Sequence, residues 1–247
     1  MGSRVDQSGG IRRETLAEQV AASLMRSIVE EGLRPGDPLP SEMRLSTRYH
    51  ISRSVAREAL RHLAALRMVQ LTNGKVPVVR PITGELLSIH YDWAIQLEAS
   101  SFVELHELRR GVEGACAYHA AVRRTSDDVA ELTGLISRME TEDDLAAFVD
   151  LDVRLHLAVA RASHNRLLLQ TVDSMAHALG GFVRTGNESM KRAPHADPPL
   201  VRLRRGHRRI VEPILAGDGE QARARMDEHL RSAVATYVAA GPLEANR

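Results

Sequence analysis

Residues 41–67, SEMRLSTRYHISRSVAREALRHLAALR, contain two short amphipathic helices joined by a tight turn. Ser41 and Ser52 are good N-cap residues, because a serine hydroxyl accepts a hydrogen bond from a free amide of the first helical turn. We expect the first helix to reach Tyr49 and the second to run from Ser52 to Arg67. Two short helices around a three-residue turn are typical of a helix-turn-helix motif.

The flanking segments complete a small domain. Upstream, apolar residues recur at every fourth position from Leu16 to Ile28, which predicts a helix over residues 14–31. Downstream, residues 68–72 and 76–80 are rich in β-formers and flank Asn73-Gly74, a strong hairpin signal. This order predicts a winged helix-turn-helix domain over residues 11–80, with the hairpin as its wing.

The rest of the chain predicts helices only. Residues 81–84 form a linker, and the expected helices span residues 85–99, 101–123, 126–140, 143–162, 165–188, 199–216 and 219–240. We therefore predict a mainly α protein, whose second domain over residues 85–241 is an antiparallel all-α helical bundle.

Composition excludes several classes of protein. The chain has 247 residues, enough for one or two domains, and its single cysteine, Cys116, excludes a disulfide framework or a multi-cysteine metal site. No apolar run approaches the ~20 residues that span a bilayer, and the N-terminus does not resemble a signal peptide. We expect a cytoplasmic protein with no membrane segment.

Charge is divided unevenly along the chain. The formal net charge is +1, but residues 1–80 hold 13 Lys and Arg against 8 Asp and Glu, while residues 81–247 hold 20 against 24. A basic N-terminal third indicates an anion-binding module, which agrees with a helix-turn-helix that binds double-stranded DNA.

The second helix of the motif has the side chains of a recognition helix. Arg53 and Arg57 are four residues apart and share a face, and arginine can donate two hydrogen bonds to a guanine edge. The hydroxyls of Ser52 and Ser54 suit phosphate oxygens. We add Arg44 on the first helix as a DNA-backbone contact, and Lys75 at the hairpin tip as a contact to the minor groove or to a phosphate. The alternative is that these arginines form a solvated face.

Two segments resemble a known family. Residues 33–42, LRPGDPLPSE, and 51–60, ISRSVAREAL, are similar to the winged-helix domain of GntR-family transcriptional regulators. The resemblance implies DNA contacts by Arg53 and Arg57, with Ser52 and Ser54 beside them. The family usually has arginine directly after the glutamate of its Pro-Ser-Glu motif, where this chain has Met43.

The predicted bundle carries polar residues on apolar helix faces. Asp152 and His156 are four apart, beside Phe148 and Val159 on the same face. His207 and His229 each interrupt an apolar stripe, and each lies eleven residues from Asp218 in the turn between the last two helices. Positions equidistant from the turn of an antiparallel helical hairpin share one height, so the two imidazoles should meet.

A buried carboxylate is costly without a partner, and a divalent cation held by one aspartate and three neutral histidines removes that cost. We therefore predict a divalent metal site at Asp152, His156, His207 and His229, with zinc, nickel or manganese as the candidate ions. The alternative for each histidine is a hydrogen-bonded core residue. We interpret the remaining histidines as surface or structural residues: His50, His62, His90, His106, His119, His164, His177 and His195.

The same region resembles the FCD effector domain of the FadR-like GntR branch. The matching segments are ELRRGVE at residues 107–113, FVDLDVRLH at residues 148–156, SHN at residues 163–165 and HRRI at residues 207–210. The resemblance implies a helical bundle with a pocket metal at the four positions above, and an Arg109 that pairs with an effector carboxylate. The alternative for Arg109 is an intrahelical pair with Glu113.

Together these patterns predict a homodimeric, ligand-responsive transcriptional regulator of a palindromic operator, whose effector is a small carboxylate. The family resemblance implies a repressor, the more common outcome in that family, while the residues themselves leave repressor and activator open. One aspartate and three neutral histidines leave a divalent site at +1, with room for a chelating carboxylate or hydroxy acid. Two alternatives remain: a metalloregulator that senses the ion itself, and a metal-dependent hydrolase with an accessory DNA-binding module. No separate catalytic base or nucleophile motif supports the hydrolase, so we predict that the chain is not an enzyme.

Overall fold

The structure is a computed structural model that describes residues 14–98, 100–190 and 199–239. The chain divides into two compact units, residues 1–83 and 84–247, each with a hydrophobic core of its own. No helix in the described ranges is long and apolar enough to cross a bilayer. His195 and the last residues of the predicted second domain, 240 and 241, lie outside the described residues.

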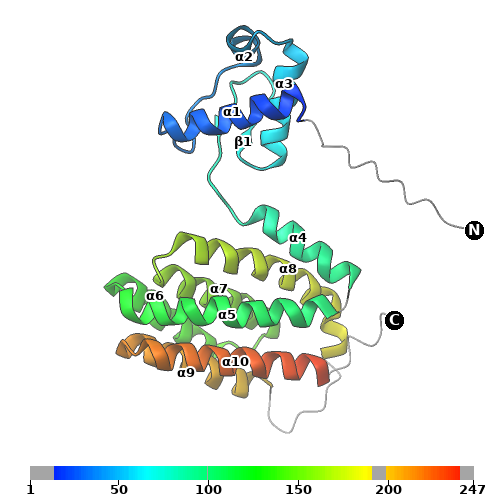
Figure 1. The fold of residues 1–247 in the computed structure, drawn as a ribbon. Coiled ribbons are helices and arrows are strands. Elements are labelled where there is room, and N and C mark those ends of the chain that lie inside the picture. The colour runs from blue at the N-terminus through cyan, green and yellow to red at the C-terminus, as the bar shows by residue number, and fades with distance from the viewer. Residues whose placement is uncertain (1–13, 99, 191–198, 240–247) are drawn as a thin grey trace, which may run out of the picture. The chain divides into compact units, whose positions relative to one another are not determined.

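The N-terminal unit contains three helices and a two-stranded sheet (Figure 1): α1 (Leu16–Glu30), α2 (Glu42–Tyr49), α3 (Arg53–Ala65), β1 (Val69–Gln70) and β2 (Val78–Val79). Ser41 and Ser52 cap α2 and α3 as predicted, each accepting a hydrogen bond from the amide three residues on. His50 ends α2 in the left-handed conformation, at φ 52°, and so turns the chain into α3. Leu45, Leu60 and Leu63 are buried and join the helices.

The wing is shorter than the sequence predicts. Val69 lies opposite Val79 in an antiparallel pair, and Gly74 turns the hairpin at φ +73°. Pro38 forms an isolated bridge with Val78, so the loop over residues 34–38 adds a third segment beside the wing. The sequence does not indicate a strand there, because a single bridge in a proline-containing segment leaves no alternating pattern.

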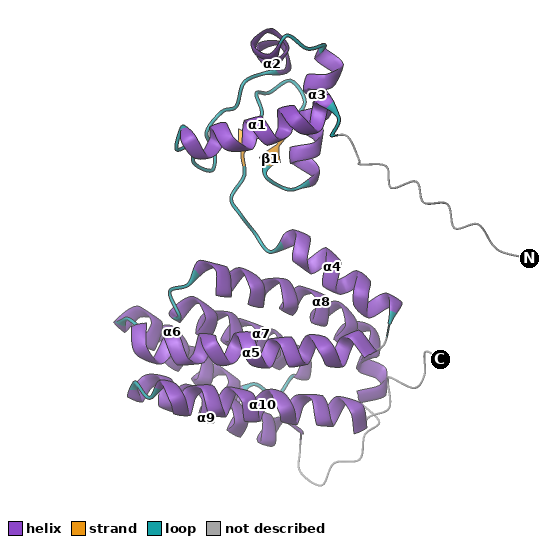
Figure 2. Ribbon diagram, viewed as in Figure 1, coloured by secondary structure: helices purple, strands orange, loops and turns teal. Residues whose placement is uncertain are grey.

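In the described part of the C-terminal unit, helices are the only regular secondary structure, and short loops join them (Figure 2). These are α4 (Glu85–Leu97), α5 (Ser100–Arg123), α6 (Ser126–Thr141), α7 (Leu145–Ala162), α8 (Arg166–Met190), α9 (Pro199–Ala216) and α10 (Gly219–Ala239). α5 packs against α7, α8, α9 and α10, while α4 lies along α8. The fully buried Ala117, Ala120 and Ala121 allow neighbouring helices to approach α5 closely. The predicted mainly α fold is confirmed.

Candidate metal and effector site

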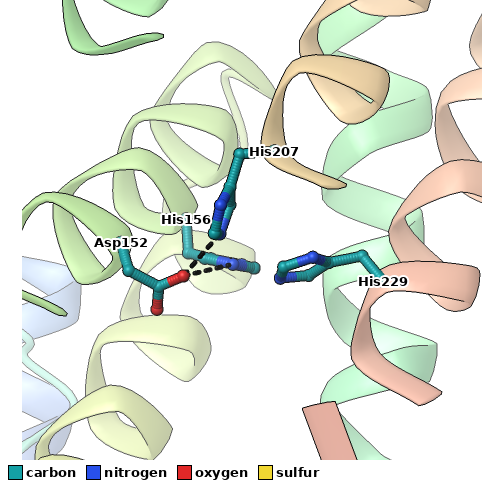
Figure 3. Close-up of side chains that lie close together, drawn as sticks. All are labelled: Asp152, His156, His207 and His229. Atoms are coloured by element: carbon teal, nitrogen blue, oxygen red, sulfur yellow. Dashed lines mark hydrogen bonds and ion pairs between the residues drawn. The ribbon is translucent and has the colours of Figure 1, made fainter. Parts of the chain in front are cut away.

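Three helices bring one aspartate and three histidines together inside the C-terminal unit (Figure 3). Asp152 and His156 extend from α7, His207 from α9 and His229 from α10. Each residue offers one donor atom, and these four atoms all lie within 4.8 Å of one another. The structure thus brings together the four residues that the sequence analysis selected as metal ligands.

The contacts within the cluster are close. His207 Nε2 lies 2.5 Å from Asp152 Oδ1, and His156 Nε2 lies 3.8 Å from the same oxygen. The rings of His207 and His229 have centroids 4.4 Å apart. The meeting of these two rings follows from their equal distance from the turn at Asp218, as predicted.

Burial and charge shape the electrostatics of the cluster. Burial, together with the nearby His207 and His156, holds the pKa of His229 well below its usual range. Burial acts to raise the pKa of Asp152, but the interactions with His207 and His156 outweigh it and lower that pKa. The cluster therefore combines the Asp152 carboxylate anion with a His229 imidazole that is neutral at pH 7. Burial acts to lower the pKa of His156, but Glu113 and Asp152 outweigh it and raise that pKa, so metal binding at His156 releases a proton.

The donor set fits a transition-metal ion in both chemistry and size. At a bond length of about 2.1 Å, two ligands on opposite sides of an ion are about 4.2 Å apart. The donor atoms spread over at most 4.8 Å, close to this span, and His207 Nε2 and Asp152 Oδ1, which are 2.5 Å apart, would separate slightly to admit an ion. His207 Nδ1 is buried and has no hydrogen-bond partner among the described residues, so no second hydrogen bond holds this ring in its present orientation.

Glu113 is a residue that the sequence analysis treated only as an alternative partner for Arg109. Its side chain is buried and holds two partners: Arg109 Nε lies 2.5 Å from Oε1, and His156 Nδ1 contacts Oε2. Burial acts to raise the pKa of Glu113, but Arg109 and His156 outweigh it and lower that pKa to about 2. The seven-residue step from His106 to Glu113 on a single helix face was the signal that could have indicated this buried acid.

His106 is a buried residue, with 6% of its surface exposed. Its ring packs on Phe102, with centroids 4.7 Å apart, and its Nδ1 has no hydrogen-bond partner in the described part of the chain. Burial and the charge of Arg109 lower its pKa to about 4. His106 is therefore a neutral buried imidazole one helical turn from Arg109.

Gly206 determines how closely α9 approaches His229. A Cβ atom at residue 206 would lie 3.2 Å from His229 Nδ1, closer than ordinary van der Waals contact. The glycine directly before His207 was the available sequence signal, because glycine within a helix often marks a close approach.

The predicted DNA-contacting residues lie on and around α3. Arg53 is exposed, and no described residue pairs with its guanidinium, whereas Arg57 donates three hydrogen bonds of 3.0–3.1 Å to Glu42 on α2. Ser52 Oγ lies 2.7 Å from Ser54 Oγ at the start of α3. Arg44 and Lys75 are exposed. Arg57 therefore joins α2 to α3, a role that the sequence analysis did not assign to it.

Three arginines of α9 near His207 form ion pairs with acidic side chains elsewhere in the C-terminal unit. Arg204 pairs with Asp143 at 2.8 Å, Arg209 pairs with Glu228 at 3.2 Å, and Arg208 pairs with Glu140. His164 is likewise structural, because its Nε2 lies 2.8 Å from Asp128 Oδ2. Arg204, Arg208 and Arg209 of α9 therefore each form an ion pair within the C-terminal unit.

Comparisons with known proteins identify both units. Residues 16–79 match the family described as bacterial regulatory proteins, gntR family, and residues 104–232 match the FCD domain. An Escherichia coli K12 protein with the provisional name L-lactate dehydrogenase operon regulatory protein is 30% identical over 87% of this chain and 83% of its own. The Bacillus subtilis regulator LutR is 31% identical over 80% of this chain and 90% of its own length.

A further relative and a solved structure are also similar to this chain. The galactonate operon transcriptional repressor of E. coli K12 is 28% identical over 83% of this chain and 89% of its own. The solved structure of Streptococcus agalactiae GntR has the same fold, with a TM-score of 0.57 and 23% identity over 88% of this chain and 98% of that one. The chain therefore belongs to the GntR family of bacterial regulatory proteins, with a C-terminal FCD domain, and is a transcriptional regulator rather than an enzyme.

Proposed function

We propose that this regulator binds a divalent transition metal at Asp152, His156, His207 and His229, and that the metal and Arg109 together bind a small hydroxycarboxylate that changes operator affinity. The observation that supports this most directly is the convergence of four donor atoms from three helices within 4.8 Å. Three imidazoles and one carboxylate suit zinc, nickel or manganese.

The charge of the site favours an anionic effector. A divalent ion with one carboxylate and neutral imidazoles retains a net charge of about +1. Four protein ligands leave two positions of an octahedral ion for a carboxylate and an adjacent hydroxyl. When bound, the metal would supply Lewis-acid attraction for these oxygens, while Arg109 would add a fork of donors for a carboxylate.

The names of relatives point to the same chemical class. One relative is named for an L-lactate dehydrogenase operon and another for a galactonate operon. Lactate and galactonate both carry a hydroxyl beside the carboxylate, the arrangement that chelates one metal ion through two oxygens. We propose a hydroxycarboxylate of this kind for the present chain.

The N-terminal unit would read one half of a palindromic operator through α3. Arg53 is the side chain best placed for base contact, because it is exposed and its guanidinium has no partner among described residues. Ser52, Ser54, Arg44 and Lys75 would contact the backbone. Arg57 would hold α3 on α2 through Glu42, at the helix pair that presents Arg53.

A homodimer would match a two-fold operator. In support, one chain exposes a run of large apolar side chains on α4, with Trp93 at 60% and Leu97 at 65% exposure. Light scattering of the wild type and of Trp93→Ser tests this, and a monomeric wild-type chain would contradict it.

Two experiments test the function. In gel shifts with operator DNA selected from a random pool, Arg53→Ala should lose sequence-specific binding while Arg26→Ala, an exposed arginine on α1, should retain it. Equal binding by both variants would contradict the assignment of α3. In thermal melts, L-lactate and D-galactonate should stabilise the zinc-loaded chain and not the chelated chain, whereas succinate should do less. Operator binding that changes with zinc alone, and with no acid, would favour the metalloregulator instead.

A further inference from the structure

We propose that Glu113 positions the metal ligand His156 and connects it to Arg109, so that one buried carboxylate joins the metal to the effector-binding arginine. This inference rests on the metal site of the proposed function. It concerns a residue that is not itself a ligand, because both oxygens of Glu113 already have protein partners.

The first step is the orientation of His156. Its Nδ1 contacts Glu113 Oε2, and a carboxylate accepts only, so Nδ1 carries the proton and donates. The opposite nitrogen, Nε2, faces Asp152 Oδ1 at 3.8 Å. Glu113 thus fixes both the tautomer and the ring plane that direct Nε2 to the site where the four donor atoms meet.

The second step is the fixed position of Glu113 itself. Its side chain is 2% exposed, and Arg109 Nε holds the other carboxylate oxygen at 2.5 Å. His207 lacks a comparable support, because its Nδ1 has no hydrogen-bond partner among the described residues. His156 therefore differs from His207 in that the ring nitrogen facing away from the cluster is held by a carboxylate.

The third step is the state of Arg109. Arg109 Nε donates to Glu113, whereas Nη1 and Nη2 donate no hydrogen bond to any described residue. These two nitrogens can therefore donate hydrogen bonds to an effector carboxylate while Nε remains hydrogen-bonded to Glu113. An acid bound to Arg109 would act on His156 through a continuous chain of two contacts, Arg109 to Glu113 and Glu113 to His156.

A buried ion pair that only stabilises the fold would have the same contacts, so the test must measure a property of the metal site itself. We would titrate the full-length, chelator-treated chain with Co²⁺ and record affinity and the visible ligand-field spectrum. Glu113→Gln keeps the size of the side chain but offers one accepting oxygen for two donors. We expect a 10- to 100-fold loss of Co²⁺ affinity and an altered spectrum, the range found for residues that support metal ligands.

Two further variants separate the roles. Glu107→Gln removes the same charge from an exposed position of α5 and should bind Co²⁺ as the wild type does. Arg109→Gln leaves the Glu113–His156 contact in place, so it should lose affinity by a smaller factor. If Glu113→Gln does not fold, Glu113→Asp is measured instead, because its shorter side chain cannot reach both partners.

The outcomes are distinct. A folded Glu113→Gln or Glu113→Asp chain with wild-type Co²⁺ affinity and spectrum overturns the positioning role while leaving the metal site intact. A wild-type chain that binds no Co²⁺ overturns the proposed function first, and this inference with it. Wild-type affinity in Arg109→Gln removes the connection to the effector-binding arginine.

Discussion

We expect Gly206→Ala to lower the metal affinity of the protein while leaving its unfolding free energy almost unchanged. Residue 206 lies inside α9, where alanine is favoured over glycine by about 1 kcal/mol. The new Cβ would lie 3.2 Å from His229 Nδ1, so the imidazole must move away by a few tenths of an ångström. Metal–ligand bonds tolerate only about 0.2 Å, which makes this shift significant for a ligand.

We expect unfolding free energy within about 1 kcal/mol of wild type and metal affinity lower by about 10- to 100-fold. The second figure corresponds to about 1.4–2.8 kcal/mol of binding free energy. Thermal or urea denaturation of the chelated chain measures the first quantity, and zinc competition with a chromophoric chelator measures the second.

Gly134→Ala is the matched control, because residue 134 lies inside α6 and a Cβ there meets nothing within 4 Å in the described structure. It should gain helix propensity without a change in zinc affinity. Equal zinc affinity in Gly206→Ala and Gly134→Ala would refute the reasoning, because it would show that His229 does not depend on the space above Gly206.

Four other predictions follow from single contacts. Gly84→Ala should lower unfolding free energy by about 1–3 kcal/mol in urea denaturation, because its Cβ would clash with the Gln170 carbonyl oxygen and force α4 away from α8; an unchanged midpoint would contradict that packing. Chelation should lower the melting temperature, because metal at 100 times its dissociation constant contributes ~2.7 kcal/mol; equal melting with and without chelator would contradict a bound metal. Asp128→Asn should destabilise the chain at pH 7: burial acts to raise the pKa of Asp128, but hydrogen bonds from Thr125 and His164 lower it. The stabilisation from these hydrogen bonds is present above the unfolded pKa of ~3.9 and is lost as pH falls through the lower folded value. The unfolding free energies of the wild type and of Asp128→Asn, measured in urea, should therefore converge as the pH falls below about 4. Arg57→Ala should lower the melting temperature of the N-terminal unit, because it breaks the Glu42 pair; loss of operator binding with an unchanged melting temperature would instead make Arg57 a DNA contact.

The fold was largely predictable because local signals agree with the tertiary structure. Ser41 and Ser52 cap the helices that they were expected to cap, and the helices from Ser126 onward end within a few residues of their predicted limits. The lengths of the two strands were overestimated. Met68, Leu71 and Val76 are β-forming residues, but they are exposed, and only two residues of each strand pair with the other.

The candidate site was predictable where spacing alone determines proximity. Asp152 and His156 share one helix, and His207 and His229 are related by the turn at Asp218, so helix geometry brings each pair together. The Glu113–His156 contact joins residues 43 apart on helices that are not adjacent in sequence, and no local period reports such a contact. The close approach at Gly206 likewise depends on how α9 and α10 pack.

Native mass spectrometry combined with elemental analysis of untagged, purified protein shows directly whether Asp152, His156, His207 and His229 hold a metal. We expect one divalent ion per chain, retained in the wild type and lost in Asp152→Ala and His207→Ala variants that still fold. A wild-type chain that carries no metal, and takes none up when zinc, nickel and manganese are supplied in turn, would contradict the proposed metal site.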